Sequence, residues 1–71
     1  MNNLMVSVID SKGRIDTPEG LDVWHYDIFE ARKEGVRFCQ DKDFPYFVVR
    51  RITNGHYKTL CYRDKNGNKI Q

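Results

Sequence analysis

The sequence YFVVRRITNGHYKTLCYR, residues 46–63, decides the fold of this chain. Val, Ile, Thr, Phe and Tyr crowd both of its halves, which is typical of β-strands. Asn54 and Gly55 stand between the halves and supply the two positive-φ residues that a tight type I′ turn requires. The stretch therefore predicts a β-hairpin, around which the rest of the chain is arranged.

The turn also predicts how the two strands of this hairpin pair. Thr53 should lie opposite His56, and each step outward should pair the next residue on either strand. Side chains alternate between the faces of a sheet, so both faces of this hairpin are half apolar. One face receives Phe47, Val49, Arg51, Thr53, His56, Lys58, Leu60 and Tyr62; the other receives Tyr46, Val48, Arg50, Ile52, Tyr57, Thr59, Cys61 and Arg63. We expect the second face to be covered by a helix, because its apolar residues continue to the turn, and the first to stay uncovered.

A second, shorter hairpin is predicted near the N-terminus. Residues 4–9 form an apolar run of strand length, and Asp10 to Gly13 match a type I turn with Asp first and Gly fourth. Residues 14–16 would return as a short strand. The same turn pattern recurs at Asp64 to Gly67, so residues 68–70 can form a short fifth strand.

The periodicity of residues 28–40 is helical. Asp27, with Glu30 three residues later, resembles a capping box at the helix start. Gly35 lies on the apolar face, where it costs about 1 kcal/mol relative to alanine, so its presence indicates close contact between helix and sheet. Ion pairs are expected between Glu30 and Lys33 and between Glu34 and Arg37. The apolar face comprises Ile28, Ala31, Gly35, Phe38 and Cys39.

Residues 17–20 can begin a helix or form a turn between two extended segments. Residues 18–26 as a whole permit two interpretations, helix or strand. Leu21, Trp24 and Ile28 have helical spacing, whereas residues 23–26 are rich in β-forming types. We slightly prefer a strand, because a helix start already fits at Asp27. A lone Trp in so small a domain is more often a core anchor than a contact residue, and the sequence leaves both roles open for Trp24.

These elements predict a single α+β domain over residues 1–71. Its order would be ββαββ, with one amphipathic helix packed on an antiparallel sheet of four or five strands. A domain of 71 residues buries only about 60% of the surface that its unfolded chain exposes. A deep enzymatic cleft would use most of that interior.

The candidate groups for catalysis or metal binding are few. Cys39, Cys61, His25 and His56 lack the close spacing of metal-ligand pairs, so we expect neither a metal site nor a cofactor. Both cysteines are assigned to the core side of the fold, where a thiol is inert. We therefore predict a protein that is not an enzyme. The sequence shows no signal peptide and no membrane-spanning run, and two cysteines are few for a small secreted domain, which favours free thiols and a cytoplasmic location.

The formal charge of +2 is unevenly distributed. Residues 1–45 carry six basic and nine acidic side chains, a net charge of −3, whereas residues 46–71 carry six basic and one acidic, a net charge of +5. The hairpin half is therefore the electropositive half, which suits an acidic or polyanionic partner. The common alternative is a solvated basic face whose long side chains lie over their apolar neighbours.

Two functions fit this pattern. The first is a small protein-binding module, a stand-alone inhibitor or adaptor that docks on a larger protein with an acidic surface, because Tyr, Trp, Phe and Arg are enriched at interface cores. Phage-encoded factors that block host machinery are similar in size and style. The alternative is a nucleic-acid binder that uses the same hairpin for phosphates and base stacking. The predicted partner-binding residues are Phe47, Arg50, Arg51, His56, Lys58, Tyr62 and Arg63.

Overall fold

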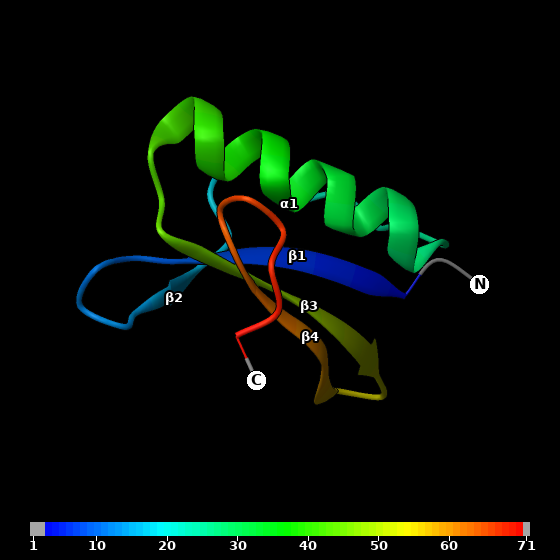
Figure 1. The fold of residues 1–71 in the computed structure, drawn as a ribbon. Coiled ribbons are helices and arrows are strands. Elements are labelled where there is room, and N and C mark those ends of the chain that lie inside the picture. The colour runs from blue at the N-terminus through cyan, green and yellow to red at the C-terminus, as the bar shows by residue number, and fades with distance from the viewer. Residues whose placement is uncertain (1–2, 71) are drawn as a thin grey trace.

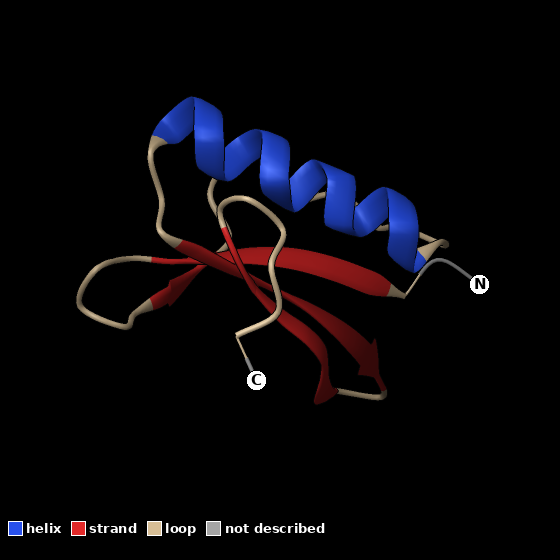
Figure 2. Cartoon of the chain, viewed as in Figure 1, coloured by secondary structure: helices blue, strands red, loops and turns tan. Residues whose placement is uncertain are grey.

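The computed structural model describes residues 3–70 as one helix packed on an antiparallel sheet (Figures 1 and 2). The sheet has four strands in the order β2-β1-β3-β4, and helix α1 lies across one of its faces. The elements are β1 (Leu4–Ile9), β2 (Ile15–Asp16), α1 (Ile28–Lys42), β3 (Tyr46–Thr53) and β4 (His56–Asp64). The predicted α+β class and ββαββ order are confirmed.

Helix α1 begins after its predicted cap, Asp27, and runs two residues beyond the predicted end at Gln40. Asp27 precedes the helix with an extended backbone, and its carboxylate accepts a hydrogen bond from the Phe29 amide at 2.8 Å. Asp43 ends the helix in the left-handed conformation, with φ 62°. The buried face consists of Ala31, Gly35 and Cys39, as the periodicity predicts. The predicted ion pairs between residues 30 and 33 and between 34 and 37 also form.

The helix packs on the opposite face of the hairpin from the one that we expected. Phe47 and Val49 are fully buried between sheet and helix, together with Val6 of β1. The ring of Phe47 lies directly against Gly35, where even a Cβ atom would overlap it. The sequence of the hairpin alone does not show which of its faces the helix covers, because the covered face also depends on the side chains of β1. Leu4, Val6 and Val8 extend the apolar face of Phe47 and Val49 across the sheet.

A β-bulge changes the pairing of the hairpin halfway along β4. From the turn to Arg50, which pairs with Thr59, the predicted register is confirmed. Beyond Arg50 the partners move by one residue, so Val49 pairs with Cys61 and not with Leu60. Each later residue of β4 then points to the face opposite to its predicted one. Tyr62 and Arg63 exchange faces in this way.

The two predicted Asp-Gly turns form with matching hydrogen bonds. In the first, the Asp10 carboxylate accepts from the amides of Lys12 and Arg14, both at 2.9 Å, and Gly13 has φ 81°. In the second, the Asp64 carboxylate accepts at the same distance from the amides two and four residues later. The first turn leads into β2. The second leads to a single bridge between Arg63 and Lys69, so residues 68–70 do not form a fifth strand.

Residues 17–27 form neither the preferred strand nor the alternative helix. The chain turns at Pro18, whose carbonyl accepts from the Leu21 amide, and then runs to the helix with one bridge between His25 and Leu4. Leu21 fills the core, whereas Trp24 is 49% exposed and therefore is not the core anchor. The β-forming residues 23–26 do not form a strand here, because this segment pairs with β1 only through the bridge at Leu4.

Candidate functional site: the open face of the sheet

One face of the sheet carries the helix, and the other carries no helix or strand of residues 3–70 (Figure 1). We call this second surface the open face. Strand pairing places its side chains, because residues directly opposite one another share a face. The open face comprises Met5, Ser7 and Ile9 of β1, Ile15 of β2, Tyr46, Val48, Arg50 and Ile52 of β3, and Tyr57, Thr59, Tyr62 and Asp64 of β4.

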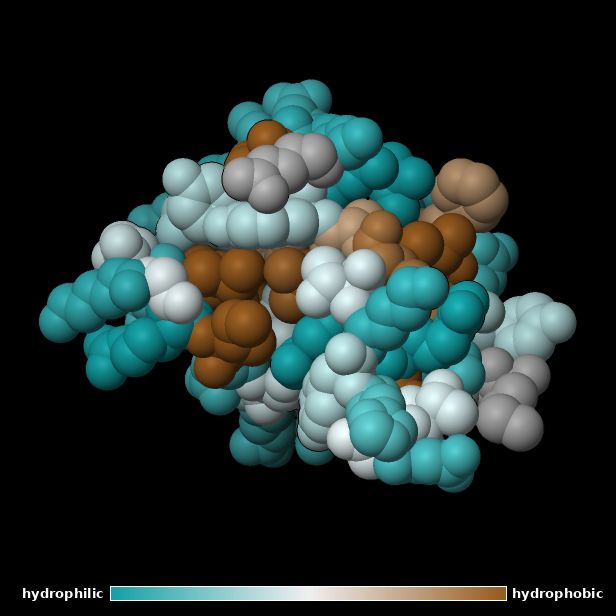
Figure 3. All heavy atoms as spheres, turned by 90° about the horizontal axis from the view of Figure 1, so that it is seen from below, coloured by the Kyte–Doolittle hydropathy of each residue, from teal (hydrophilic) through white to brown (hydrophobic). Residues whose placement is uncertain are grey.

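Buried, mostly aliphatic side chains form the base of the open face, and more exposed tyrosine side chains extend outward from it. Ser7, Ile9 and Val48 are buried although they point away from the helix. Tyr57 is 60% exposed and Ile15 53% exposed, and these two side chains stand on the outer strands of the sheet. Figure 3 looks onto this side of the molecule, where hydrophobic atoms in brown gather beside hydrophilic atoms in teal. A surface of this kind resembles the core and rim of a protein interface.

Arg50 lies on β3, one of the two central strands, and neighbouring side chains on the open face hold it in place. Its Nη2 donates to the Ser7 hydroxyl at 2.9 Å, and that hydroxyl shares a 2.7 Å hydrogen bond with Thr17. The guanidinium carbon lies 4.7 Å from the ring centroid of Tyr57, a cation–π contact. The Nε atom of Arg50 is buried without a hydrogen-bond partner. No carboxylate of residues 3–70 forms an ion pair with this guanidinium, so its charge is ordered but not neutralised.

Two further tyrosines stand at the other end of the same face. The rings of Tyr46 and Tyr62 meet edge to face, with centroids 5.9 Å apart. This contact exists because the bulge turns Tyr62 to the side of Tyr46. Together with Tyr57 they give the open face three partly or largely exposed aromatic side chains.

The predicted site residues are divided between the two faces. Phe47 is fully buried beneath the helix, so the prediction that it contacts a partner is wrong. Arg50 and Tyr62 lie on the open face. Arg51 and Lys58 lie opposite each other on the helix side, near the hairpin turn, where His56 is exposed. Arg63 also lies on the helix side, and its Nη1 donates to the Gly67 carbonyl at 3.1 Å, which stabilises the C-terminal turn.

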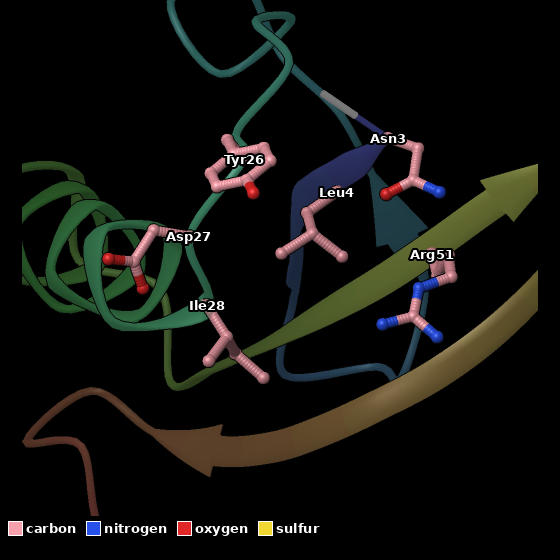
Figure 4. A pocket seen from close by; sticks show the side chains of 6 residues that line it. All are labelled: Asn3, Leu4, Tyr26, Asp27, Ile28 and Arg51. Carbon is pink, nitrogen blue, oxygen red and sulfur yellow. The ribbon is translucent and has the colours of Figure 1, made fainter. Parts of the chain in front are cut away.

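Arg51 lines a groove of about 610 Å³ at the start of the helix (Figure 4). Tyr26 and Ile28 form one side of the groove, and Asn3, Leu4 and Arg51 form the other. The carboxylate of Asp27 points away from Arg51 and is used by the helix cap. The side chains around this groove have no arrangement for general acid–base or nucleophilic chemistry.

The thiols and acidic groups do not cluster into a metal site in the part of the chain that the structure describes. Burial raises the pKa of Cys39 to about 11, and its thiol donates to the Tyr46 carbonyl. Cys61 is half-buried and free. No group of three His, Cys, Asp or Glu side chains among residues 3–70 comes close enough to hold a metal ion. No helix within these residues has the length and apolar character that crossing a membrane requires.

Sequence reasoning missed Tyr46, Tyr57 and Ile15 as parts of the open face, and it missed the buried Ser7 as the residue whose hydroxyl holds Arg50. The alternation within residues 4–8 is the signal that could have identified them. Leu4, Val6 and Val8 share one face and are all aliphatic, whereas the opposite face of this strand carries the polar Ser7. Pairing this strand with residues 46–53 would have marked the face of Val49 as the core. Comparisons with protein-family models, curated proteins and solved structures give no significant match to this chain.

Proposed function

We propose that this protein is a binding module that docks through its open face on an acidic surface of a larger protein. The observation that carries the proposal is Arg50, an ordered arginine without a carboxylate partner, set among tyrosines on an uncovered sheet. Arg and Tyr are, with Trp, the residue types enriched at interface hot spots. A chain of this size with one docking face suits an inhibitor or adaptor, and we place it in the cytoplasm on the sequence patterns described above.

The partner that fits this face presents an Asp or Glu side chain to Arg50, with apolar groups around it. Charge-assisted hydrogen bonds between guanidinium and carboxylate are stronger than neutral ones. Ser7 and Tyr57 already hold the Arg50 side chain, so little further conformational entropy is lost when the carboxylate arrives. The exposed parts of Tyr57 and Ile15 would supply apolar contact at the edges of the interface.

The division of charged and aromatic groups between two faces argues against nucleic acid as the ligand. A single-strand binder needs cations along the backbone path beside rings that are free to stack on bases. Here Arg51, Lys58 and Arg63 lie on the helix side, whereas the exposed tyrosines lie on the open face. One ring face of Tyr57 is already occupied by Arg50. A protein surface therefore fits the arrangement better.

Two adjacent arginines provide a matched test of the proposal. Arg50→Gln removes the charge from the open face, and Arg51→Gln removes the same charge from the helix side. The partner is first recovered from the source cells by affinity capture, and its binding to each purified, folded variant is then measured by calorimetry. Loss of a hot-spot side chain costs at least about 2 kcal/mol, which is roughly a 30-fold weaker Kd. We expect this loss for Arg50→Gln and little change for Arg51→Gln.

Equal binding by both variants, or selective loss in Arg51→Gln, would contradict docking through the open face. Single-stranded oligonucleotides provide the second arm of the test. If three or four basic residues contact phosphates, log K falls against log salt with a slope of about −2 to −4. Such a slope, together with weaker binding by Arg50→Gln, would establish nucleic acid as the ligand instead.

A further inference from the structure

The chain contains two Asn-Gly pairs, at residues 54–55 and 66–67, which the fold holds in different surroundings. An Asn followed by Gly can deamidate without an enzyme. The Gly backbone nitrogen attacks the Asn side-chain carbonyl carbon, a C–N bond forms and ammonia leaves; water then opens the succinimide to Asp or isoaspartate. The reaction is favoured before Gly, because no side chain hinders the attacking nitrogen and the backbone can rotate.

Asn66 lies in a turn whose backbone is extensively hydrogen-bonded. The Gly67 amide, which would have to attack, donates to the Asp64 carbonyl at 3.0 Å. The Gly67 carbonyl accepts from Arg63, and the Asn66 amide donates to the Asp64 carboxylate at 2.9 Å. Gln40 of the helix donates to the Lys65 carbonyl at 3.2 Å and to the Asn66 side chain at 3.5 Å. Succinimide formation here requires several of these bonds to break.

Asn54 lies at the tip of the β3–β4 hairpin, where the backbone has fewer restraints. Asn54 and Gly55 are both exposed, and both have positive φ, 50° and 79°. The Gly55 amide donates no hydrogen bond to any residue between 3 and 70. An added Cβ at Gly55 would meet no heavy atom within 4 Å, so the tip is surrounded by open space. Only the hairpin tip has to open for the attacking nitrogen to reach the side chain.

We infer that Asn54 is a site of spontaneous deamidation in the folded protein and that Asn66 is protected by its turn. The product adds a negative charge two residues from His56 and close in sequence to Arg51 and Lys58. Isoaspartate also adds a methylene to the backbone, which a two-residue type I′ turn does not accommodate. Deamidation at Asn54 would therefore reduce the positive charge of the basic hairpin and loosen its tip.

Mass spectrometry of peptides from protein incubated at mildly alkaline pH tests this inference. In the folded protein we expect deamidation at Asn54 to be several-fold faster than at Asn66. In concentrated urea the two rates should become similar, because both Asn residues precede Gly in an unfolded chain. Equal rates in the folded protein, or faster reaction at Asn66, would overturn the inference.

A variant of the helix separates local protection from global stability. Gln40→Ala removes the contacts of α1 with Lys65 and Asn66 and does not touch the hairpin tip. We expect deamidation at Asn66 to accelerate in this variant while the rate at Asn54 stays unchanged. An equal acceleration at both sites would show that global unfolding controls the reaction, and would contradict protection by the turn.

Discussion

Gly35 fixes the distance between helix and sheet at the scale of a single residue. A glycine within a helix normally costs about 1 kcal/mol relative to alanine. Here the missing side chain leaves room for the ring of Phe47, which lies against the helix backbone. This contact places Phe47 on the helix side of the hairpin, the same side as the aliphatic residues of β1.

We expect Gly35→Ala to destabilise the protein although alanine favours helices. The added Cβ overlaps the Phe47 ring, and overpacking of this kind costs about 1–3 kcal/mol, which exceeds the gain in helix propensity. Urea unfolding of the wild type and the variant measures the free energy of unfolding. In a Phe47→Leu background the same substitution should cost less, since the smaller side chain leaves space. A stabilising Gly35→Ala in the wild type would refute the close contact.

Cys39 provides a second prediction at this scale. Its side chain is fully buried and burial raises its pKa to about 11, so almost no thiolate is present near neutral pH. We expect a thiol reagent at neutral pH to modify Cys39 only when the protein unfolds, and therefore more slowly than the half-buried Cys61. Mass spectrometry of labelled peptides over time follows both sites. Prompt modification of Cys39 in the folded protein would contradict its burial.

The elements show which parts of the structure are set locally. Helix α1, both Asp-Gly turns and the Asn54–Gly55 hairpin form as their own residues predict, because caps, turn residues and periodicity act within a few positions. The bulge after Thr59 and the path of residues 21–27 were not predictable in this way. Both depend on contacts with distant parts of the chain, and no local pattern marks them.

The carboxyl groups of the two Asp-Gly turns make the stability of the folded protein depend on pH. Hydrogen bonds from the Arg14 amide to Asp10 and from the Asn68 amide to Asp64 are the main causes that lower the pKa of each carboxyl. A pKa that is lower in the folded state adds stability above the ordinary value of 3.8, and this stability is lost as the pH falls through the folded pKa. The Lys65 ammonium likewise lowers the pKa of Asp43.

We expect Asp10→Asn/Asp64→Asn to weaken the loss of stability in acid. The amide oxygen of Asn can accept the same backbone hydrogen bonds but does not titrate. Urea unfolding at a series of pH values between neutral and acid gives the slope. The double variant should show a shallower decline than the wild type, and part of the decline should remain because Asp43 still titrates. An unchanged slope would mean that these turns do not carry the acid sensitivity.

At the scale of the whole molecule, the arrangement of charge on two faces is the feature with functional consequences. The sequence predicts the α+β class, the strand order along the chain and the basic C-terminal half. It does not predict which basic residue stands on which face, since that depends on the pairing of β1 with β3 and on one bulge. Arg50 and Arg51 are neighbours in sequence, yet only Arg50 belongs to the open face. The candidate site therefore moves from the Arg51–Lys58 pair to Arg50 and the tyrosines around it.

Docking through the open face is tested most directly by photo-crosslinking from two adjacent positions on β4. Tyr57 points to the open face and Lys58, one residue further from the turn, points to the helix side, so a photoreactive amino acid at each position samples one face. Each variant is first shown to fold, and is then irradiated with the captured partner. We predict a covalent complex from position 57 and little or none from position 58. A complex from position 58 alone would contradict the claim.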